Sequence, residues 1–338
     1  MGIRPITIGI VGCGNAARTI HLPVLRRHAD KFSIVACTDC DRDKADAFCR
    51  EVEATSYHDF EQLLRDDRVE LVLVLTKPPS THRDIALASL SHGKHVLVEK
   101  PMADTVAQCV EMVDAAKSSG RVLTVHQNRR WDVDFLTVQN ALERGLVGDP
   151  RLIRNEFVTG YEGSAFDWGI HLVDQSVCLS RGRRFVEISA TMARPNAAAP
   201  LASKGFFTAR LRTDDGVIHD VSSLPSVQGT RFRPGVLLPR FVLTGTAGTL
   251  IQNWCQRPED AFGDSVRFEG HDPGGPTPGD PPFIEAVLSI PDFYALLYDT
   301  IRECASVPVD PESARRSVGL WTSICESAAA GKMLTIDL

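Results

Sequence analysis

The sequence has no long apolar run, no excess of positive charge and few aromatic side chains. No stretch reaches the roughly 18 consecutive apolar residues of a membrane span, and we expect no signal peptide because no apolar stretch with a small-residue cleavage site is found near residue 1. The formal net charge is -6, whereas generic binders of nucleic acid or anionic membranes are usually basic. The sequence therefore predicts that neither nucleic acid nor a membrane is a partner.

Cysteine is present, but without the pairing that is typical of a secreted protein. The nine Cys residues are odd in number and scattered along the chain, which favours free thiols in a reducing cytoplasm. Cys37 and Cys40 form a lone C-x-x-C motif, which is a poor zinc site because no second pair and no histidine cluster accompany it. We expect a cytoplasmic protein with no metal site, in which such thiols are mostly small buried side chains.

Two patterns divide the 338 residues. In the first half, apolar runs alternate with helical segments, which predicts a doubly wound parallel sheet. The expected strands are 6–11, 33–38, 54–56, 71–75, 95–98 and 122–125, and the expected helices are 15–29, 42–51, 58–65, 81–91 and 104–117. The pattern changes after about residue 125, and one more helix is expected at 131–144. In the second half, strand-like runs follow one another at 152–158, 185–193, 206–211, 217–224, 241–244 and 249–251, with helices at 167–179, 292–305 and 311–330 and a loop at 273–282. Consecutive strands favour a mainly antiparallel sheet.

A glycine-rich motif follows the first expected strand and opens the first expected helix. Residues 12–17 read GCGNAA, which is G-x-G-x-x-A. The first glycine permits a tight turn, the second lets backbone approach a pyrophosphate, and Ala17 allows close packing of helix on sheet. The start of the helix offers free N–H groups to phosphate. The motif predicts a dinucleotide cofactor, with ligands from Gly12, Cys13, Gly14, Asn15 and Ala16.

Asp39 stands at the end of the second expected strand, where an acidic side chain accepts hydrogen bonds from the ribose hydroxyls of the adenosine. A carboxylate at this position would repel a 2′-phosphate. The sequence therefore predicts NAD as the cofactor, with NADP possible because Arg42 and Lys44 follow closely and blunt the repulsion. The alternative is an ordinary turn between strand and helix, in which Asp39 is a cap.

Several motifs together resemble the glucose-fructose oxidoreductase, inositol dehydrogenase and rhizopine catabolism (Gfo/Idh/MocA) family. They are residues 10–14 (IVGCG), 99–101 (EKP) and a D-x-x-x-H-x-x-D pattern at 167–174, supported by residues 76–82, 128–131 and 307–309. The resemblance implies an oxidoreductase made of a Rossmann domain (1–126) and a substrate-binding and oligomerisation α/β domain (127–338) with a large open sheet. It also implies a homodimer or homotetramer and a sugar, a cyclitol or a derivative as substrate. Residues 128–135 and 167–175 look most like the subgroup that includes scyllo-inositol dehydrogenases.

The candidate catalytic residues lie in two of these motifs. Lys100 follows the fifth expected strand, at the sheet edge where doubly wound folds bind ligands. Asp167, His171 and Asp174 are spaced i, i+4 and i+7, so they share one face of a helix. The resemblance implies that Lys100 reaches the substrate oxygen and the nicotinamide, that His171 is the acid or base, and that Asp167 assists it. The alternatives are a solvated strand end for Glu99 and Lys100, a helix cap for Asp167 and a core histidine for His171.

The resemblance adds further positions to the cofactor site. Glu99 is expected to contact the ribose on the nicotinamide side, and His82 either packs under the cofactor or only begins a helix. The loop before Asp167 is shorter than is usual in the family, and in it Tyr161 and Glu162 either contact substrate or are ordinary polar loop residues. The added cofactor positions are Thr76, Pro78, His82, Glu99, Lys100 and Asn128.

Three functions fit these residues. The leading hypothesis is a nicotinamide-dependent dehydrogenase or reductase that transfers a hydride between NAD(P) and a CH–OH group of a sugar or cyclitol. The second is a glycoside hydrolase or eliminase that uses bound nicotinamide transiently, with no net redox change. The third is a non-catalytic dinucleotide sensor, which the presence of both Lys100 and His171 disfavours.

Overall fold

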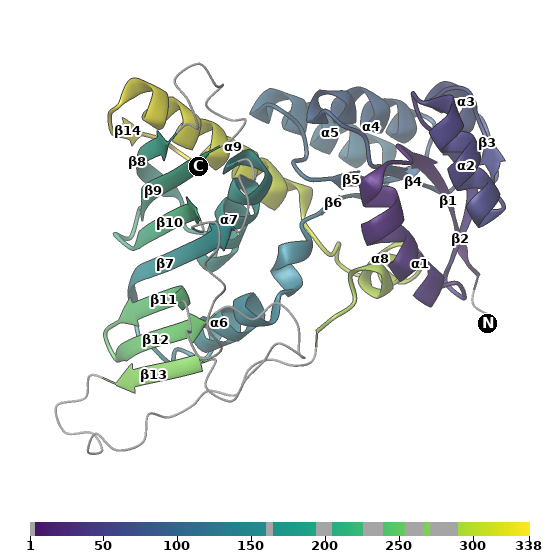
Figure 1. Cartoon of the computed structure of the whole chain (residues 1–338). Helices are drawn as coiled ribbons and strands as arrows, with labels where there is room; N and C mark the ends of the chain where they lie inside the picture. Colours follow the sequence, from purple (N-terminus) through teal and green to yellow (C-terminus); the bar gives the residue numbers. More distant parts are fainter. Residues whose placement is uncertain (1–3, 160–164, 194–204, 226–238, 254–265, 271–289) are drawn as a thin grey trace. The chain divides into compact units, whose positions relative to one another are not determined.

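The computed structural model describes residues 4–159, 165–193, 205–225, 239–253, 266–270 and 290–338. The chain divides into two compact units (Figure 1). Unit 1 comprises residues 1–127 and 291–318, and unit 2 comprises residues 128–290 and 319–338. Both units are therefore discontinuous in sequence. In the part of the chain that the structure describes, no helix is both long and apolar enough to cross a bilayer.

Unit 1 is built on a six-stranded parallel sheet of order β3-β2-β1-β4-β5-β6. The central strands β1 and β4 consist mainly of apolar residues and are almost fully buried, as expected for a sheet covered on both faces. The strand order reverses at β1, which lies between β2 and β4, and this switch point is where such sheets bind ligands. The strands are β1 (Ile6–Val11), β2 (Phe32–Thr38), β3 (Thr55–Ser56), β4 (Leu71–Val74), β5 (His95–Glu99) and β6 (Leu123–His126).

Polar side-chain caps mark the start of three helices of unit 1, α2, α3 and α5. Asp41 accepts a hydrogen bond from the Lys44 amide at the start of α2, Asp59 caps α3, and Thr105 and Gln108 form a capping box at the start of α5. The first expected helix, 15–29, contains a π-helical turn, η1, before α1. The elements are η1 (Ala17–His21), α1 (Leu22–Arg27), α2 (Arg42–Val52), α3 (Phe60–Leu64), η2 (Pro79–Thr81), α4 (His82–Ser91), α5 (Val106–Ser119) and α8 (Phe293–Glu303). Helix α9 (Pro311–Ala330) begins in unit 1 and ends in unit 2.

Unit 2 contains an eight-stranded sheet of order β13-β12-β11-β7-β10-β9-β8-β14. Strands β7 and β10 are parallel, and the other neighbouring pairs are antiparallel. The fold class expected from the sequence is thus confirmed, although β13 and β14 were not expected. The elements are η3 (Asn128–Trp131), α6 (Val133–Glu143), β7 (Pro150–Thr159), α7 (Ala165–Leu179), β8 (Phe185–Ala193), β9 (Phe206–Thr213), β10 (Ile218–Pro225), β11 (Pro239–Gly245), β12 (Gly248–Asn253), β13 (Val266–Gly270) and β14 (Leu334–Thr335). The expected loop 273–282 lies outside the described residues.

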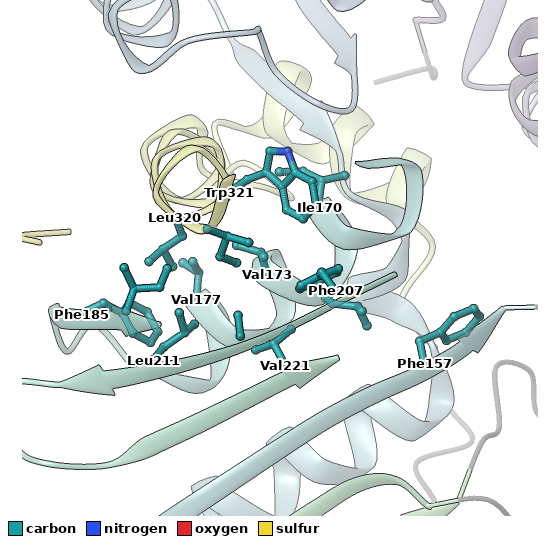
Figure 2. Packing of buried hydrophobic residues seen from close by; sticks show 14 residues of the cluster. Phe157, Ile170, Val173, Val177, Phe185, Phe207, Leu211, Val221, Leu320 and Trp321 are labelled. Atoms are coloured by element: carbon teal, nitrogen blue, oxygen red, sulfur yellow. The ribbon is translucent and has the colours of Figure 1, made fainter. Parts of the chain in front are cut away.

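The main core of unit 2 lies where α7 and the second half of α9 pack on the sheet (Figure 2). Val173 and Val177 of α7 meet Leu320 of α9 and side chains of β9 and β10. Gly169 is required on α7 because a Cβ there would collide with the ring of Trp321. This packing fixes the rotation of α7, so the helix face that carries the candidate catalytic residues is determined by the core on its other side.

Candidate cofactor and active site

The glycine-rich loop follows β1 at the switch point of the unit 1 sheet. Gly12 has a φ of +102°, a conformation that L side chains rarely adopt, and a Cβ there would lie 2.8 Å from the carbonyl carbon and oxygen of Leu75. Gly14 differs, because a Cβ there would have no heavy atom within 4 Å. The space above Gly14 is thus open to a ligand that approaches the backbone. Both glycine positions fit a bound dinucleotide.

Asp39 connects the end of β2 to this loop. Its Oδ2 accepts a hydrogen bond from the Cys13 amide at 2.7 Å, and its Oδ1 accepts one from the Asp41 amide at 2.9 Å. A carboxylate has about four lone-pair sites, so Asp39 retains acceptor capacity for hydroxyl groups. The two nearby cations already have partners: Arg42 contacts His58 at 2.8 Å, and Lys44 forms an ion pair with Asp41 at 3.0 Å.

The loops after β4 and β5 are joined by His82. Its Nδ1 lies 2.9 Å from the carbonyl oxygen of Pro101, and its Nε2 lies 3.0 Å from that of Thr76. The ring is buried, and α4 begins at this residue. Pro78 lies in the same loop, where its carbonyl accepts the Thr81 hydroxyl hydrogen bond at 2.8 Å. His82 therefore holds two of the expected cofactor-site loops together.

Glu99 and Lys100 stand at the carboxyl end of β5. Lys100 is half-buried, and its amide donates to Glu99 Oε2 at 3.2 Å. Glu99 Oε1 lies 2.9 Å from His21 Nε2 and 2.7 Å from His126 Nδ1. The hydroxyl of Tyr294 lies 2.5 Å from His21 Nδ1 and completes the group. We call His21, Glu99, His126 and Tyr294 the Glu99 cluster.

The sequence analysis did not single out three members of the Glu99 cluster. His126 ends β6 and pairs with Glu99 across the sheet, so the rule that places ligands at strand ends would have identified it. His21 and Tyr294 carry no such local signal, because they come from η1 and α8. The donor atoms of His21, Glu99 and His126 all lie within 4.8 Å of one another, which makes them a candidate metal group as well as a hydrogen-bonded one.

Helix α7 in unit 2 carries the D-x-x-x-H-x-x-D pattern, as expected. His171 and Asp174 are buried, and Asp167 in the first turn is half-buried. The ring of His171 lies 6.0 Å from that of Trp168 between centroids. The i, i+4, i+7 spacing places the three polar residues on one face of the helix. Lys100 belongs to unit 1 and these three residues to unit 2.

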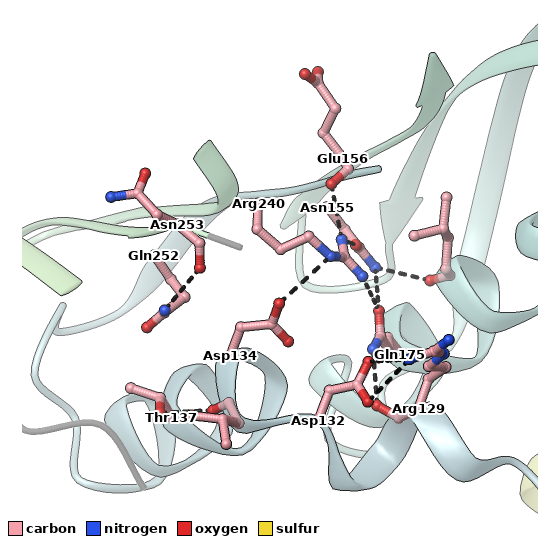
Figure 3. Close-up of polar contacts among 12 residues, drawn as sticks. Arg129, Asp132, Asp134, Thr137, Asn155, Glu156, Gln175, Arg240, Gln252 and Asn253 are labelled. Atoms are coloured by element: carbon pink, nitrogen blue, oxygen red, sulfur yellow. Dashed lines mark hydrogen bonds and ion pairs between the residues drawn. The ribbon is translucent and has the colours of Figure 1, made fainter. Parts of the chain in front are cut away.

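A buried polar network lies beside α7 (Figure 3). Its centre is Arg240 on β11, which donates to the side chain of Asn155, to the carbonyl of Glu156 at 3.0 Å and to Gln175 Oε1 at 2.6 Å. Asp134 lies 3.9 Å from the same guanidinium. Gln175 also donates to the carbonyl of Arg129 at 3.0 Å, which ties α7 to η3. The network therefore fixes the segment that begins at residue 128.

Arg129, at the edge of this network, stacks on an aromatic pair. Its guanidinium carbon lies 4.8 Å from the centroid of the Trp168 ring, and that ring stacks on Phe157 at 4.2 Å. The neighbouring carboxyl of Asp132 is mostly buried, and burial raises its pKa to about 7 although Arg129 opposes the shift. Asn128 begins η3, next to Arg129. Tyr161 and Glu162 lie outside the described residues.

The thiols of the C-x-x-C motif differ in environment. Cys37 is buried in β2, whereas Cys40 is exposed in the following turn. Both are free thiols in the structure.

Comparisons with known proteins agree with this geometry. Residues 6–127 match the family model described as "Oxidoreductase family, NAD-binding Rossmann fold". The chain is 28% identical over 325 residues to the uncharacterized oxidoreductase YdgJ of Escherichia coli, covering 88% of each chain. It is 25% identical over 374 residues to scyllo-inositol 2-dehydrogenase (NADP(+)) IolW of Bacillus subtilis, covering 99% of this chain and 97% of that one. With inositol 2-dehydrogenase of Salmonella typhimurium it shares 32% identity over 148 residues, 43% of this chain and 44% of that protein.

The fold is shared over the whole length with solved structures. An NAD-binding protein from Listeria innocua superimposes with a TM-score of 0.80 at 22% identity, covering 99% of this chain and 100% of that one. The parallel sheet and the family match define an NAD(P)-binding oxidoreductase with a Rossmann fold. The match of residues 6–127 and the relatives named above agree with the resemblance to the Gfo/Idh/MocA family that the motifs indicated, and the expected NAD(P) cofactor and dehydrogenase or reductase class are confirmed.

Proposed function

We propose that this protein transfers a hydride between NAD(P) and a secondary hydroxyl or carbonyl group of a sugar, a cyclitol or a derivative. The observation that carries the proposal is the position of Lys100, directly after β5, at the ligand-binding edge of an NAD(P)-binding Rossmann sheet. The nearly full-length similarity to a scyllo-inositol 2-dehydrogenase supports the substrate class. Cyclitols and sugars carry the secondary hydroxyl groups that such a reaction needs.

Three side chains are proposed to act on the substrate. Hydride transfer from an alcohol requires a base for the hydroxyl proton and a donor that stabilises the developing alkoxide. We assign the base to His171, which is buried on α7, and the donor to Lys100, whose ammonium opposes the growing negative charge. Asp167, one turn before His171, orients the imidazole or the substrate. The nicotinamide supplies the hydride acceptor when bound.

The cofactor is proposed to bind to unit 1, and the substrate to meet residues of unit 2. The pyrophosphate would face the residues of the glycine-rich loop, and Asp39 would accept the adenosine ribose hydroxyls, which favours NAD over NADP. The loops that His82 joins would border the nicotinamide side. The proposed cofactor residues are Gly12, Cys13, Gly14, Asn15, Ala16, Asp39, Thr76, Pro78, His82, Lys100 and Asn128.

A turnover screen tests this proposal. The protein is incubated with NAD or NADP and a panel of cyclitols, aldoses and sugar acids while nicotinamide absorbance is followed. We expect reduction of NAD by at least one cyclitol or aldose, and in Lys100→Met a fall in turnover of ~100-fold or more with cofactor affinity nearly unchanged. Full turnover in Lys100→Met would contradict the role of Lys100. Product formation without net absorbance change would instead identify a glycoside hydrolase or eliminase with transient redox.

We also propose a homodimer or homotetramer, on the family resemblance together with the large sheet of unit 2, since one face of an antiparallel sheet can pack against a partner. Light scattering after gel filtration tests this. A single species with the mass of one chain, 37.0 kDa, would contradict it.

A further inference from the structure

The Glu99 cluster is assembled from four separate elements of unit 1. Glu99 and His126 end the neighbouring strands β5 and β6 and pair across the sheet. Because paired residues of adjacent strands point to the same face, their side chains meet directly. His21 reaches them from η1 and Tyr294 from α8. All four side chains are buried. Because buried polar groups are normally hydrogen-bonded, each donor and acceptor of the cluster is expected to have a partner.

One arrangement of protons satisfies every contact in the cluster. Burial raises the pKa of Tyr294 well above its usual value, so its hydroxyl donates to His21 Nδ1. Burial and the proximity of His126 lower the pKa of His21, which is therefore neutral and donates through Nε2 to Glu99 Oε1. Burial alone would raise the pKa of Glu99, but His126 and the hydrogen bond from His21 hold it well below its usual range. Glu99 is therefore a carboxylate that accepts from both rings.

The other oxygen of Glu99 is directed to Lys100. Oε2 accepts the Lys100 amide at 3.2 Å, while Oε1 already accepts two ring N–H groups at 2.7 and 2.9 Å. The Glu99 side chain is only 12% exposed. We propose that Glu99 is a positioning residue, which, held by His21 and His126, fixes the backbone of Lys100 and does not bind the cofactor ribose. The inference rests on the proposed function only in taking Lys100 as the catalytic group.

This assignment replaces the expectation that Glu99 contacts the ribose on the nicotinamide side. A ribose contact would require a carboxylate oxygen that faces the cofactor and is free to accept hydroxyl groups. Oε1 is instead saturated by two buried donors from η1 and β6, and Oε2 is directed to the Lys100 amide, so that three of the roughly four lone-pair sites are already used within the protein. A catalytic lysine must be held within a fraction of an ångström of its productive position, and a carboxylate anchored at two histidines is a rigid support for that purpose.

The interatomic distances favour hydrogen bonds over a bound metal. Metal–nitrogen and metal–oxygen bonds to zinc are about 2.0–2.1 Å, which separates two ligand atoms of a tetrahedral site by roughly 3.3 Å. Glu99 Oε1 lies closer than this to both histidine nitrogens, at 2.7 and 2.9 Å. The two rings therefore contact the carboxylate directly. Metal analysis of the purified protein checks this, and one zinc per chain would overturn the assignment.

The decisive experiment separates kcat from cofactor affinity. In Glu99→Gln we expect kcat to fall ~10-fold or more, because the support of Lys100 is lost, while the Kd for NAD changes by less than about twofold. A ribose-binding residue would behave in the opposite way, with a raised Kd for NAD and a conserved kcat, and that result would overturn the inference. Lys100→Met is measured in parallel. If it retains full turnover, the proposed function fails, whereas its inactivity together with parental kcat in Glu99→Gln refutes the positioning role alone.

A milder pair of variants covers the case in which Glu99→Gln does not fold. Tyr294→Phe removes only the hydroxyl that orients His21. Tyr298→Phe is the matched control, since it makes the same change one turn later on α8, where the hydroxyl donates instead to the carbonyl of Arg4 at 3.3 Å. We expect Tyr294→Phe to lower kcat several-fold at unchanged Kd for NAD, and Tyr298→Phe to match the parent. Equal kcat in all three proteins would overturn the inference.

Discussion

Arg130 and Asp174 form a bidentate ion pair, in which Nε lies 2.7 Å from Oδ2 and Nη2 lies 2.6 Å from Oδ1. Their side chains are 14% and 2% exposed, so the pair is largely shielded from water. Asp174 follows His171 by three residues on α7, and Arg130 lies in η3. The pair therefore fixes the position of η3 against the helix face that carries the proposed base, and it accounts for the second aspartate of the D-x-x-x-H-x-x-D pattern.

Removing one member of this ion pair is expected to lower the free energy of unfolding. Arg130→Met would leave the Asp174 carboxylate buried without its bidentate partner, and such losses typically destabilise by about 3–5 kcal/mol. The double variant Arg130→Met/Asp174→Leu should recover part of that loss, because no buried charge remains. Chemical denaturation of the four proteins of this double-mutant cycle measures the coupling. Simple additivity of the two single effects would show that the pair contributes little.

Asp132 should make unit 2 less stable as the pH rises. Its pKa of about 7 in the folded protein lies above the ordinary value of 3.8, so the folded state holds the proton more tightly than the unfolded state. Stability from this group is complete below pH 4 and is lost as the pH rises through 7, by an amount on the order of 4 kcal/mol. Asp132→Asn cannot ionise, and Asp132 makes no side-chain capping bond that the change would break.

Thermal unfolding of parent and Asp132→Asn from pH 4 to 8 tests this expectation. The variant should gain stability over the parent as the pH rises, and the difference should level off above pH 7. A constant difference over the whole range would mean that Asp132 does not titrate there.

His219 should have the opposite effect over nearly the same pH range, because its contribution to stability grows as the pH rises. It is fully buried beside Phe185, with ring centroids 5.2 Å apart, and burial lowers its pKa to about 4. Since the unfolded chain takes up the proton first, near pH 6.5, stability is lost as the pH falls from 6.5 to 4, by roughly 3 kcal/mol. His219→Leu removes the titrating group, so its stability should depend less on pH in this range. Denaturant midpoints at pH 4, 5 and 7 decide the matter, and parallel pH profiles would refute the prediction.

Asp39→Asn should shift cofactor preference toward NADP. The neutral amide removes the repulsion between a carboxylate and a 2′-phosphate, while its oxygen still accepts the Cys13 amide hydrogen bond. We expect KM for NADP to fall and KM for NAD to rise, each by several-fold. Steady-state kinetics with both cofactors measures the change, with Asp43→Asn on α2 as the control for loss of a nearby negative charge. An identical shift in both variants would indicate a general charge effect.

Local signals predicted most of the fold. The strands β1 and β4 were predicted because a buried strand leaves a run of mainly apolar residues that is visible locally in the sequence. The two-residue strand β14 was missed because its pairing with β8 is decided by distant partners. The π-helical turn of η1 also left no signature in the spacing of apolar residues.

The candidate site was predictable where topology alone places a residue. Lys100 was predicted to follow a strand at the edge where the carboxyl ends of parallel strands meet, and it follows β5, whereas its catalytic role rests on the family resemblance and stays a prediction. The partners of Glu99 were not predicted, because Tyr294 and His21 are 273 positions apart and nothing in either segment indicates the other. The Arg240 network was missed for the same reason, since Arg240 and Asn155 are 85 positions apart.

The discontinuity of the two units has a consequence for how the protein is made. All six strands of the Rossmann sheet are synthesised within residues 6–126, but Tyr294 and the rest of residues 291–318 follow only after nearly all of unit 2. Domains generally fold as units during synthesis, yet here the first sheet must wait, with its η1 and β5 side chains incompletely paired, for a helix translated much later. An isolated cofactor-binding fragment would accordingly need residues 291–318 joined after residue 127, and a simple truncation there would leave His21 without its tyrosine.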